Sequence, residues 1–351
     1  MVRVVVDNMV VTTIVPDKSG SCTGSPARQS EKRMQELDRM DDQPRVTEVA
    51  DGIFAIDTLF QGQQGSVAAY LVVGPDGLGL VETGPSTVST ALAAGVTAAG
   101  YAIDDITDIV VTHIHLDHAG ALGGLMQQLE HVQAWVHPVG LPHMVNPEKL
   151  VNSASRIYGE RMEQLWGEII PAPEDRLHAT EHRVPIIVGG RMLVPFDTPG
   201  HASHHIALLD EQTGSLFTGD VAGVRVQGTS LAIPPMPPPD IDLDAWNRSI
   251  DLMLEIAPQR IMLTHFGSFT DVETHLAMVR DGIEAQMSIG REVLVPGGTD
   301  EEMTERLEAW VRQRLGNDAE AAWGALDAAN PLFMGALGIR RVLRKAGELE
   351  A

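Results

Sequence analysis

The sequence predicts an α/β protein in which sheets and helices form separate layers. Between about residues 46 and 270, short runs rich in β-branched residues alternate with segments of helical spacing. Glycine, proline and aspartate separate these runs, as is typical of turns between elements. Hydrophobic residues make up 44% of the 351 residues, which is ample material for a buried core.

Residues 1–45 depart from this pattern and are expected to form an N-terminal extension or arm. Residues 4–15 are β-branched and indicate a strand, whereas residues 17–28 are small and polar, as in loops. Residues 29–42 are charged and have helical spacing. The segment either packs on a partner subunit, which we favour, or is a partly ordered extension.

The central region, residues 46–270, is expected to be a catalytic domain built on a sheet framework. Helices are expected at residues 87–99 and 119–130, and as an insertion at residues 152–167. The proline-rich run at residues 234–239 cannot be regular structure, because proline lacks the amide donor. The expected strands are residues 67–73, 78–82, 109–112, 134–137, 192–197, 206–210, 215–218 and 260–264.

The remaining part of the chain, residues 271–351, is expected to be helical. Thr299 with Glu302 forms a capping box at the start of one helix, and Gly316 ends that helix. Residues 331–345 are typical of a last helix with basic residues near its C-terminal end. Apolar faces on these helices, together with the N-terminal extension, predict a homodimer.

The charge balance narrows the range of partners. The chain has 25 Lys and Arg against 48 Asp and Glu, a formal net charge of −23. Such a surface repels phosphate backbones and acidic lipid leaflets, so neither nucleic acid nor a membrane is expected as a partner. A small neutral molecule is the expected substrate, because few basic residues lie near the site motifs described below.

Cysteine content and hydropathy give two further expectations. The single cysteine, Cys22, allows neither an intramolecular disulfide nor a cysteine-based metal site. No apolar run reaches the length of about 18 residues that a membrane span needs, and the first apolar run is too short for a signal peptide. A cytoplasmic location is therefore expected.

One dense cluster of histidine and aspartate dominates the sequence. His113, His115, Asp117 and His118 follow the strand expected at residues 109–112 and open the next helix. Two imidazoles two positions apart on extended backbone point the same way, and the Asp-His pair turns toward the same point at the helix start. Imidazole and carboxylate together suit zinc, with iron or manganese as alternatives.

Three further candidates stand where expected strands end. His201 closes a Thr-Pro-Gly-His run, Asp220 closes Phe-Thr-Gly-Asp, and His265 lies in Thr-His-Phe-Gly. The carboxyl ends of strands are where α/β sheets place their functional sites. The set predicts one metal centre assembled from distant parts of the chain.

Taken in order, these motifs resemble those of the metallo-β-lactamase-fold hydrolases over residues 46–270. The resemblance implies an αβ/βα sandwich with a metal site at one edge between two sheets. It implies that His113, His115 and His201 hold one metal, and that a second metal and its bridge come from Asp117, His118, His265 and Asp220. It further implies one or two zinc ions per chain, with Asp117 and Asp220 as the catalytic residues that take or relay a proton.

Two positions depart from the family pattern. Glu82 stands in Glu-Thr-Gly where the family usually has Asp-Thr-Gly, an acid that orients a ligand histidine. The extra methylene either shifts this geometry and weakens one metal position, or is absorbed by the backbone. His205 matches the second histidine of the family's Gly-His-x-x-Gly-His pattern, although His204 replaces the glycine before it. We expect His205 to pack beside the ligands rather than bind metal.

The implied activity is hydrolysis, because a bound cation lowers the pKa of water to about 7 and the resulting hydroxide attacks an electrophile. The motif from His113 to Gly120 also occurs in lactonase-type members, and hydrolytic dehalogenases of the chlorothalonil type resemble the chain in overall layout. A lactone, an ester or an activated aryl halide is therefore the expected substrate. The alternatives are an iron-dependent redox enzyme of the persulfide dioxygenase type and a phosphotriester hydrolase.

Specificity is expected from residues 145–167, residues 221–240 and the C-terminal helices. The candidate pocket residues are Tyr158, Trp166, Arg225, Met236 and Phe266.

Overall fold

The computed structural model describes residues 2–6, 9–13 and 45–350, which belong to two compact units, Met1–Gln43 and Pro44–Ala351. In the first unit, β1 (Val2–Val6) pairs antiparallel with β2 (Met9–Thr13). One strand was expected across residues 4–15, and the structure has a hairpin of two. The loop expected at residues 17–28 and the helix expected at residues 29–42 lie outside the described residues.

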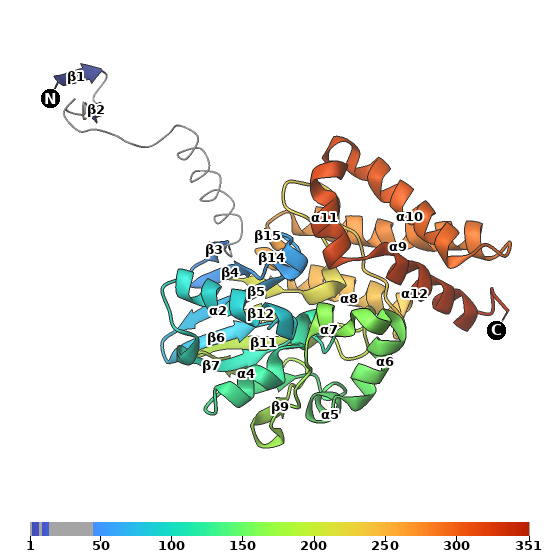
Figure 1. The fold of residues 1–351 in the computed structure, drawn as a ribbon, viewed down its shortest axis with the longest axis horizontal. Coiled ribbons are helices and arrows are strands. Elements are labelled where there is room, and N and C mark those ends of the chain that lie inside the picture. Colours follow the sequence, from blue (N-terminus) through green and yellow to red (C-terminus); the bar gives the residue numbers. More distant parts are fainter. Residues whose placement is uncertain (1, 7–8, 14–44, 351) are drawn as a thin grey trace, which may run out of the picture. The chain divides into compact units, whose positions relative to one another are not determined.

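The second unit contains two sheets, shown in Figure 1. The first sheet has seven strands in chain order, antiparallel from β3 to β6 and parallel from β6 to β9. Its strands are β3 (Val46–Ala50), β4 (Ile53–Asp57), β5 (Ala68–Gly74), β6 (Gly77–Val81), β7 (Ile106–Val110), β8 (Gln133–Val136) and β9 (Leu177–Ala179).

The second sheet has six strands in chain order, all antiparallel neighbours except the parallel pair of β13 and β14. Its strands are β10 (Ile186–Val188), β11 (Arg191–Asp197), β12 (Ile206–Asp210), β13 (Ser215–Phe217), β14 (Arg260–Leu263) and β15 (Gly267–Phe269). All eight strands expected from the sequence are therefore present, with ends shifted by up to three residues.

A buried apolar layer joins the two sheets face to face. It includes Tyr70 from the first sheet and Phe217 and Met262 from the second, each at most 1% exposed. Alternating side chains on each strand supply this layer, because successive residues of a strand point to opposite faces. The other face of each sheet is left for helices to cover.

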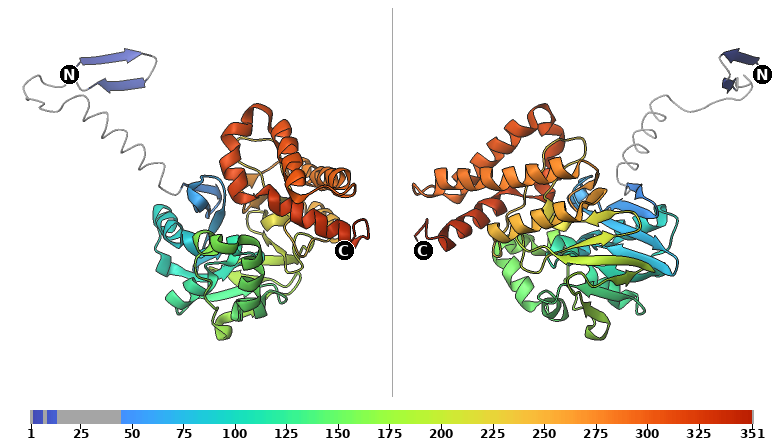
Figure 2. Two further views of the ribbon diagram at one scale, coloured as in Figure 1. Left: turned by 45° about the vertical axis from the view of Figure 1, so that its right-hand side comes forward. Right: turned by 180° about the vertical axis from the view of Figure 1, so that it is seen from behind.

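Helices cover both outer faces, and Figure 2 shows them on opposite sides of the paired sheets. Against the first sheet pack α2 (Ser89–Ala98) and α4 (Leu122–Gln128). The second sheet is covered by α8 (Leu243–Ile256), α9 (Val272–Leu294), α10 (Asp300–Leu315), α11 (Ala319–Ala329) and α12 (Leu332–Lys345). This arrangement confirms the expected αβ/βα sandwich with C-terminal helices.

One local prediction is confirmed and another is corrected. The capping box forms as expected, since Thr299 accepts from the Glu302 amide and the Glu302 side chain accepts from the Thr299 amide. The single insertion helix expected at residues 152–167 is two helices, α6 (Glu148–Tyr158) and α7 (Met162–Trp166). Gly159, with φ of 53°, separates them because this backbone conformation favours glycine.

The homodimer stays a prediction, but one of the two reasons for it, the apolar faces of the C-terminal helices, no longer supports it. The apolar face of α9, including Leu276 and Ile283, is buried inside the chain against the second sheet. We still expect a dimer, now on the strength of the N-terminal extension. Light scattering at micromolar concentration should give twice the monomer mass, and a monomeric mass would contradict the expectation.

None of the helices in the described part of the chain combines the length and apolar character that crossing a bilayer requires.

Candidate metal centre

Seven side chains from four separate segments meet at one edge of the sandwich. The short helix α3 (Leu116–Ala119) and the loop before it supply four of them, and the other three come from connections in the second sheet. A short 3₁₀ turn, η6 (Gly219–Ala222), carries one of these three. The side chains are His113, His115, Asp117, His118, His201, Asp220 and His265.

The first group surrounds His115. The Nδ1 atom of His115 lies 3.0 Å from His113 Nε2 and 2.9 Å from His201 Nε2. Asp220 completes the group, with its Oδ2 3.3 Å from His201 Nε2. One atom from each of these four residues lies within 4.8 Å of the others, a spacing that can enclose one metal ion.

The second group lies on the other side of Asp220. Asp117 Oδ2 is 3.4 Å from His265 Nε2 and 3.8 Å from His118 Nε2. The remaining oxygen of Asp220, Oδ1, lies 3.2 Å from His118 Nε2 and 3.4 Å from His265 Nε2. One carboxylate oxygen of Asp220 therefore faces each group, as a residue bridging two metal ions would.

The outer nitrogens of three histidines are held by fixed acceptors. The Nδ1 of His118 donates to Glu82 Oε1 at 3.0 Å, and those of His201 and His265 donate to the carbonyls of Pro235 and Ser66 at 2.9 and 2.8 Å. Because a carbonyl or carboxylate oxygen only accepts, Nδ1 carries the proton in each ring. The Nε2 lone pairs are then directed into the cluster, as metal ligation requires.

Apart from the charged contacts just described, three inward-facing atoms of the cluster form no hydrogen bond with the described residues. They are His118 Nε2, His265 Nε2 and Asp220 Oδ1, all fully buried. An unpartnered buried polar atom costs about 1–3 kcal/mol, so three together need an explanation. A divalent cation would satisfy all three, and the nitrogen and oxygen donors suit zinc, iron or manganese.

The histidines of the first group are neutral, as imidazoles must be to bind a metal ion. Burial, followed by the neighbouring His118, holds the pKa of His113 well below the ordinary histidine value. Burial and the adjacent His201 lower the pKa of His115 to about 4. Both imidazoles are therefore neutral near pH 7, with lone pairs free for a cation.

The second group carries both a negative charge and a proton. Burial would raise the pKa of Asp117, but His118 and His265 outweigh it and bring the value to about 2. Burial would lower the pKa of His118, but the surrounding carboxylates, led by Asp220, raise it well above its ordinary value. A cation that binds this group therefore displaces protons.

Glu82 occupies the place of the acid that orients His118. Its backbone adopts the left-handed conformation, with φ of 68°. Its carboxylate accepts from His118 Nδ1, from the Thr112 hydroxyl and from the Thr264 hydroxyl at 3.2 Å. The carboxylate of Glu82 thus holds the ring of His118 in place. Glutamate, which is one methylene longer than the usual aspartate, makes this contact from a left-handed backbone conformation.

Replacing Glu82 by glutamine is expected to lower metal affinity by about 10–100-fold, because the neutral amide is a weaker acceptor for the ring that it holds. Metal affinity measured by competition with a chelating dye checks this. Glu82→Asp is the matched comparison, since it keeps the charge and shortens the reach. Unchanged metal affinity in Glu82→Gln would show that the contact is not needed.

His205 supports the cluster from behind. Its Nδ1 lies 2.8 Å from the Thr198 hydroxyl, and its Nε2 accepts from the backbone amide of Asp220 at 3.1 Å. The ring is fully buried and stands outside both ligand groups. It holds the turn that carries Asp220, in agreement with the packing role expected for it.

Gly219 is required by the same turn. It has φ of 47°, and a Cβ atom here would lie 2.5 Å from Thr112 Oγ1 and 2.6 Å from His205 Nε2. Gly219→Ala is expected to cost about 3 kcal/mol of unfolding free energy and to weaken metal binding. Denaturant unfolding of the variant checks this, with Gly228→Ala as control, because Gly228 also has positive φ but open space around it. Equal stability of the two variants would contradict the prediction.

Comparison with known proteins agrees with this geometry. A family model described as the metallo-beta-lactamase superfamily matches residues 51–265, more than half of the chain. The chain belongs to the metallo-β-lactamase superfamily. The matched segment contains all seven side chains of the cluster.

The relatives are distant. A metallo-beta-lactamase fold-containing protein of Sulfurisphaera tokodaii, ST1585, is 28% identical over 192 residues, covering 53% of this chain and 71% of its own length. A probable metallo-hydrolase of Bacillus subtilis, YqjP, is 26% identical over 172 residues, covering 45% of this chain and 53% of its own. The crystal structure of the metallo-beta-lactamase family protein TTHA1429 from Thermus thermophilus superposes with a TM-score of 0.60 at 23% identity, over 80% of this chain and 89% of that chain.

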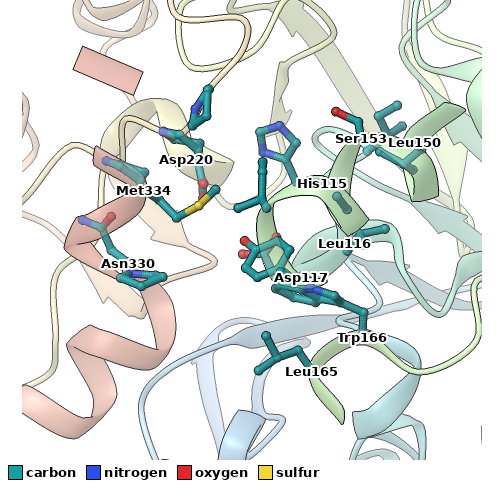
Figure 3. Close-up of a pocket in the computed structure, with 18 of the residues that line it drawn as sticks. His115, Leu116, Asp117, Leu150, Ser153, Leu165, Trp166, Asp220, Asn330 and Met334 are labelled. Carbon is teal, nitrogen blue, oxygen red and sulfur yellow. The ribbon is translucent and has the colours of Figure 1, made fainter. Parts of the chain in front are cut away.

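In this superfamily member, the cluster opens into a cavity of about 400 Å³. Figure 3 shows Leu150 and Ser153 on one side of the cavity and Asn330 and Met334 on the other, with Asp117 between them. Much of the lining comes from α6 and α7, from the proline-rich loop and from the junction of α11 and α12. These three segments lie in the regions expected to determine specificity, and other segments, including Phe60 and His143, complete the lining.

Two of the five candidate pocket residues line this cavity. Trp166 stacks on Phe60, with ring centroids 5.4 Å apart, and Tyr158 meets its edge at 5.1 Å. The three rings form an aromatic wall next to Asp117, which also lines the cavity. Burial and the charge of Asp117 raise the pKa of Tyr158, so its hydroxyl keeps its proton.

The other three candidates do not line the cavity. Arg225 forms an ion pair with Asp271 at 2.9 Å and lies over the ring of Phe269. Its charge is therefore not available to bind a substrate. Met236 is fully buried in the core beneath the C-terminal helices, and Phe266 is buried between the sheets. Each stands close in sequence to the site, but its side chain packs into the protein interior.

Several cavity-lining residues were not among the candidates from the sequence. His204 is 8% exposed and lines the cavity, as does His143, which has no motif around it. Lys149 and Arg161 also line it. The helical spacing of Lys149 with Ser153 and Ile157 was a signal for one shared face, but nothing local says which face meets the site.

Proposed function

We propose that the chain is a hydrolase that uses two zinc ions to activate water against an electrophilic carbon of a small molecule. The observation that carries this proposal is the pair of ligand groups that share Asp220 and open into a cavity large enough for such a substrate. A lactone, a carboxylic ester or an activated aryl halide is the proposed substrate class. The printed name of the Bacillus subtilis relative, a probable metallo-hydrolase, supports the reaction type.

Divalent cations held there would supply water of lowered pKa and a Lewis acid for the attacked group. Asp117 is the more exposed of the two cluster carboxylates that line the cavity, with 20% of its side chain exposed, and its low pKa leaves it ionised and able to accept a proton. Asp220, at 5% exposure, is more enclosed and holds the two groups together through its contacts to His118, His201 and His265. The protonated hydroxyl of Tyr158 is placed to donate to a substrate oxygen.

The test is a substrate screen with zinc-loaded protein. Lactones, aryl esters, activated aryl halides and phosphotriesters are each tested as substrates, and product formation is followed by chromatography. Turnover of a carbon electrophile that stops in chelator and returns with zinc supports the proposal. Preference for the phosphotriesters would favour the alternative expected from the sequence.

Elemental analysis of protein purified without added metal tests the other alternative, the iron-dependent redox enzyme. That alternative uses the same nitrogen and oxygen ligands, so the geometry does not separate the two. Stoichiometric iron together with an oxygen-dependent reaction would overturn the hydrolase proposal.

A further inference from the structure

Two cations line one wall of the cavity without an ion pair. Lys149 stands in the first turn of α6, and Arg161 follows that helix at the start of α7. Neither side chain forms a hydrogen bond or ion pair with another described residue. Acidic residues outnumber basic ones by nearly two to one in this chain, yet these two cations form no ion pair with the described residues. They are therefore available to bind an anionic ligand in the cavity.

The spacing along α6 shows that Lys149 belongs to the cavity face. The helix lines the cavity with Lys149, Ser153 and Ile157, which lie four residues apart on one face. Arg156 is on the same helix and exposed, but it does not line the cavity. The helix therefore carries one cation toward the site and one away from it.

The acidic residues of the cavity lie elsewhere. Asp117 and Asp220 belong to the metal cluster, and Asp240 accepts from the Ser203 hydroxyl at 2.7 Å. The exposed Asp327 is carried by α11, whose end meets α12 on the far side of the cavity from α6 (Figure 3). Lys149 and Arg161 therefore lie on the α6 side of the cavity and Asp327 on the side of α11, an asymmetry that would orient a charged substrate.

Aromatic and aliphatic side chains also line the cavity near these cations. Phe60, Trp166 and Tyr158, whose rings form the aromatic wall, line the cavity together with Leu165, and the charges of both Asp117 and Arg161 act on Tyr158. Arg161 is near enough to Tyr158 for its charge to act on that hydroxyl. An apolar segment can therefore lie between the reacting group and the cations.

We infer that the substrate carries a carboxylate at the end of an apolar body, and that the positive charges of Lys149 and Arg161, at the two ends of α6, attract this carboxylate to the α6 side of the cavity. The inference rests on the proposed hydrolase function and replaces the neutral substrate expected from the sequence. Each exposed charge pair contributes about 0.2–1 kcal/mol, so each cation should change kcat/KM by up to about five-fold.

The test compares two esters with the same leaving group and acyl chains of equal length, 4-nitrophenyl hexanoate and mono-4-nitrophenyl adipate. Zinc-loaded wild-type protein is expected to prefer the anionic adipate ester by about ten-fold in kcat/KM. Lys149→Gln and Arg161→Gln should each lower this preference about three-fold, and the double variant should remove it. Arg156→Gln is the matched control and should keep the preference.

A binding measurement separates failure of this inference from failure of the proposed function. Quenching of tryptophan fluorescence by hexanoate and by hexanamide is compared in wild-type protein and the double variant, because Trp166 lines the cavity. If neither ester is hydrolysed but the double variant loses affinity for hexanoate alone, the hydrolase proposal fails and the anion site stands. If the esters are hydrolysed with the same preference in the double variant as in wild type, the anion site is overturned and the hydrolase proposal stands.

Discussion

Asp220→Ala is expected to reduce turnover by at least about 10³-fold, the largest loss among single substitutions in this chain. Its two oxygens lie within 3.4 Å of three imidazoles, so removing them takes one donor from each ligand group. Metal content should fall in parallel, and plasma mass spectrometry of the purified variant measures it. The steady-state rate should not recover at high zinc.

The control for this variant is Asp281→Ala, which removes an exposed carboxylate on α9 that belongs to neither ligand group and does not line the cavity. It should keep both metal content and rate. Circular dichroism must show that Asp220→Ala is folded, because loss of a buried charge also changes stability. A folded Asp220→Ala protein with wild-type metal content and rate would contradict the bridging role.

Asp117→Ala is the second large expected effect. This residue joins only the second ligand group, and its carboxylate faces the cavity. We expect about one metal ion fewer per chain and a fall in kcat of at least about 10²-fold, while the fold survives. Because the low pKa of Asp117 keeps the wild-type carboxylate ionised above about pH 3, the loss should be the same across the neutral range.

The readout for Asp117→Ala is kcat together with metal content on the same preparation. Asp117→Asn is the conservative comparison, since it keeps the shape and one oxygen ligand but cannot accept a proton. If Asp117→Ala retained kcat with normal metal content, the residue would be neither a ligand nor a proton acceptor.

Much of the fold was predictable because its signals are local. Each core strand is a β-branched run between turn residues, and the capping box at Thr299 needs only four consecutive positions. The strands β3, β4, β9, β10 and β15 were missed. Three of them, β9, β10 and β15, have only three residues, too few to show alternation. Charge and helical spacing alone also could not show that Gly159 divides the insertion into α6 and α7.

The metal cluster was predictable for a different reason. Its residues stand at strand ends, and sheet topology brings strand ends together. The cavity walls have no such rule, because they combine α6, the proline-rich loop and the junction of α11 and α12. Arg225 illustrates the difficulty, since only the folded chain shows that Asp271 already binds it. Lys149 is the opposite case, because only the folded chain shows that its face of α6 lines the cavity.

Metal stoichiometry with chelator reversal tests the central claim most directly. Protein purified without added metal is loaded with zinc, passed through a desalting column, and assayed for metal content and ester hydrolysis before and after dialysis against a chelator. The two ligand groups predict about two zinc ions per chain, complete loss of hydrolysis on removal and full return on readdition. Undiminished hydrolysis by metal-free protein would contradict the claim that these seven side chains act through bound cations.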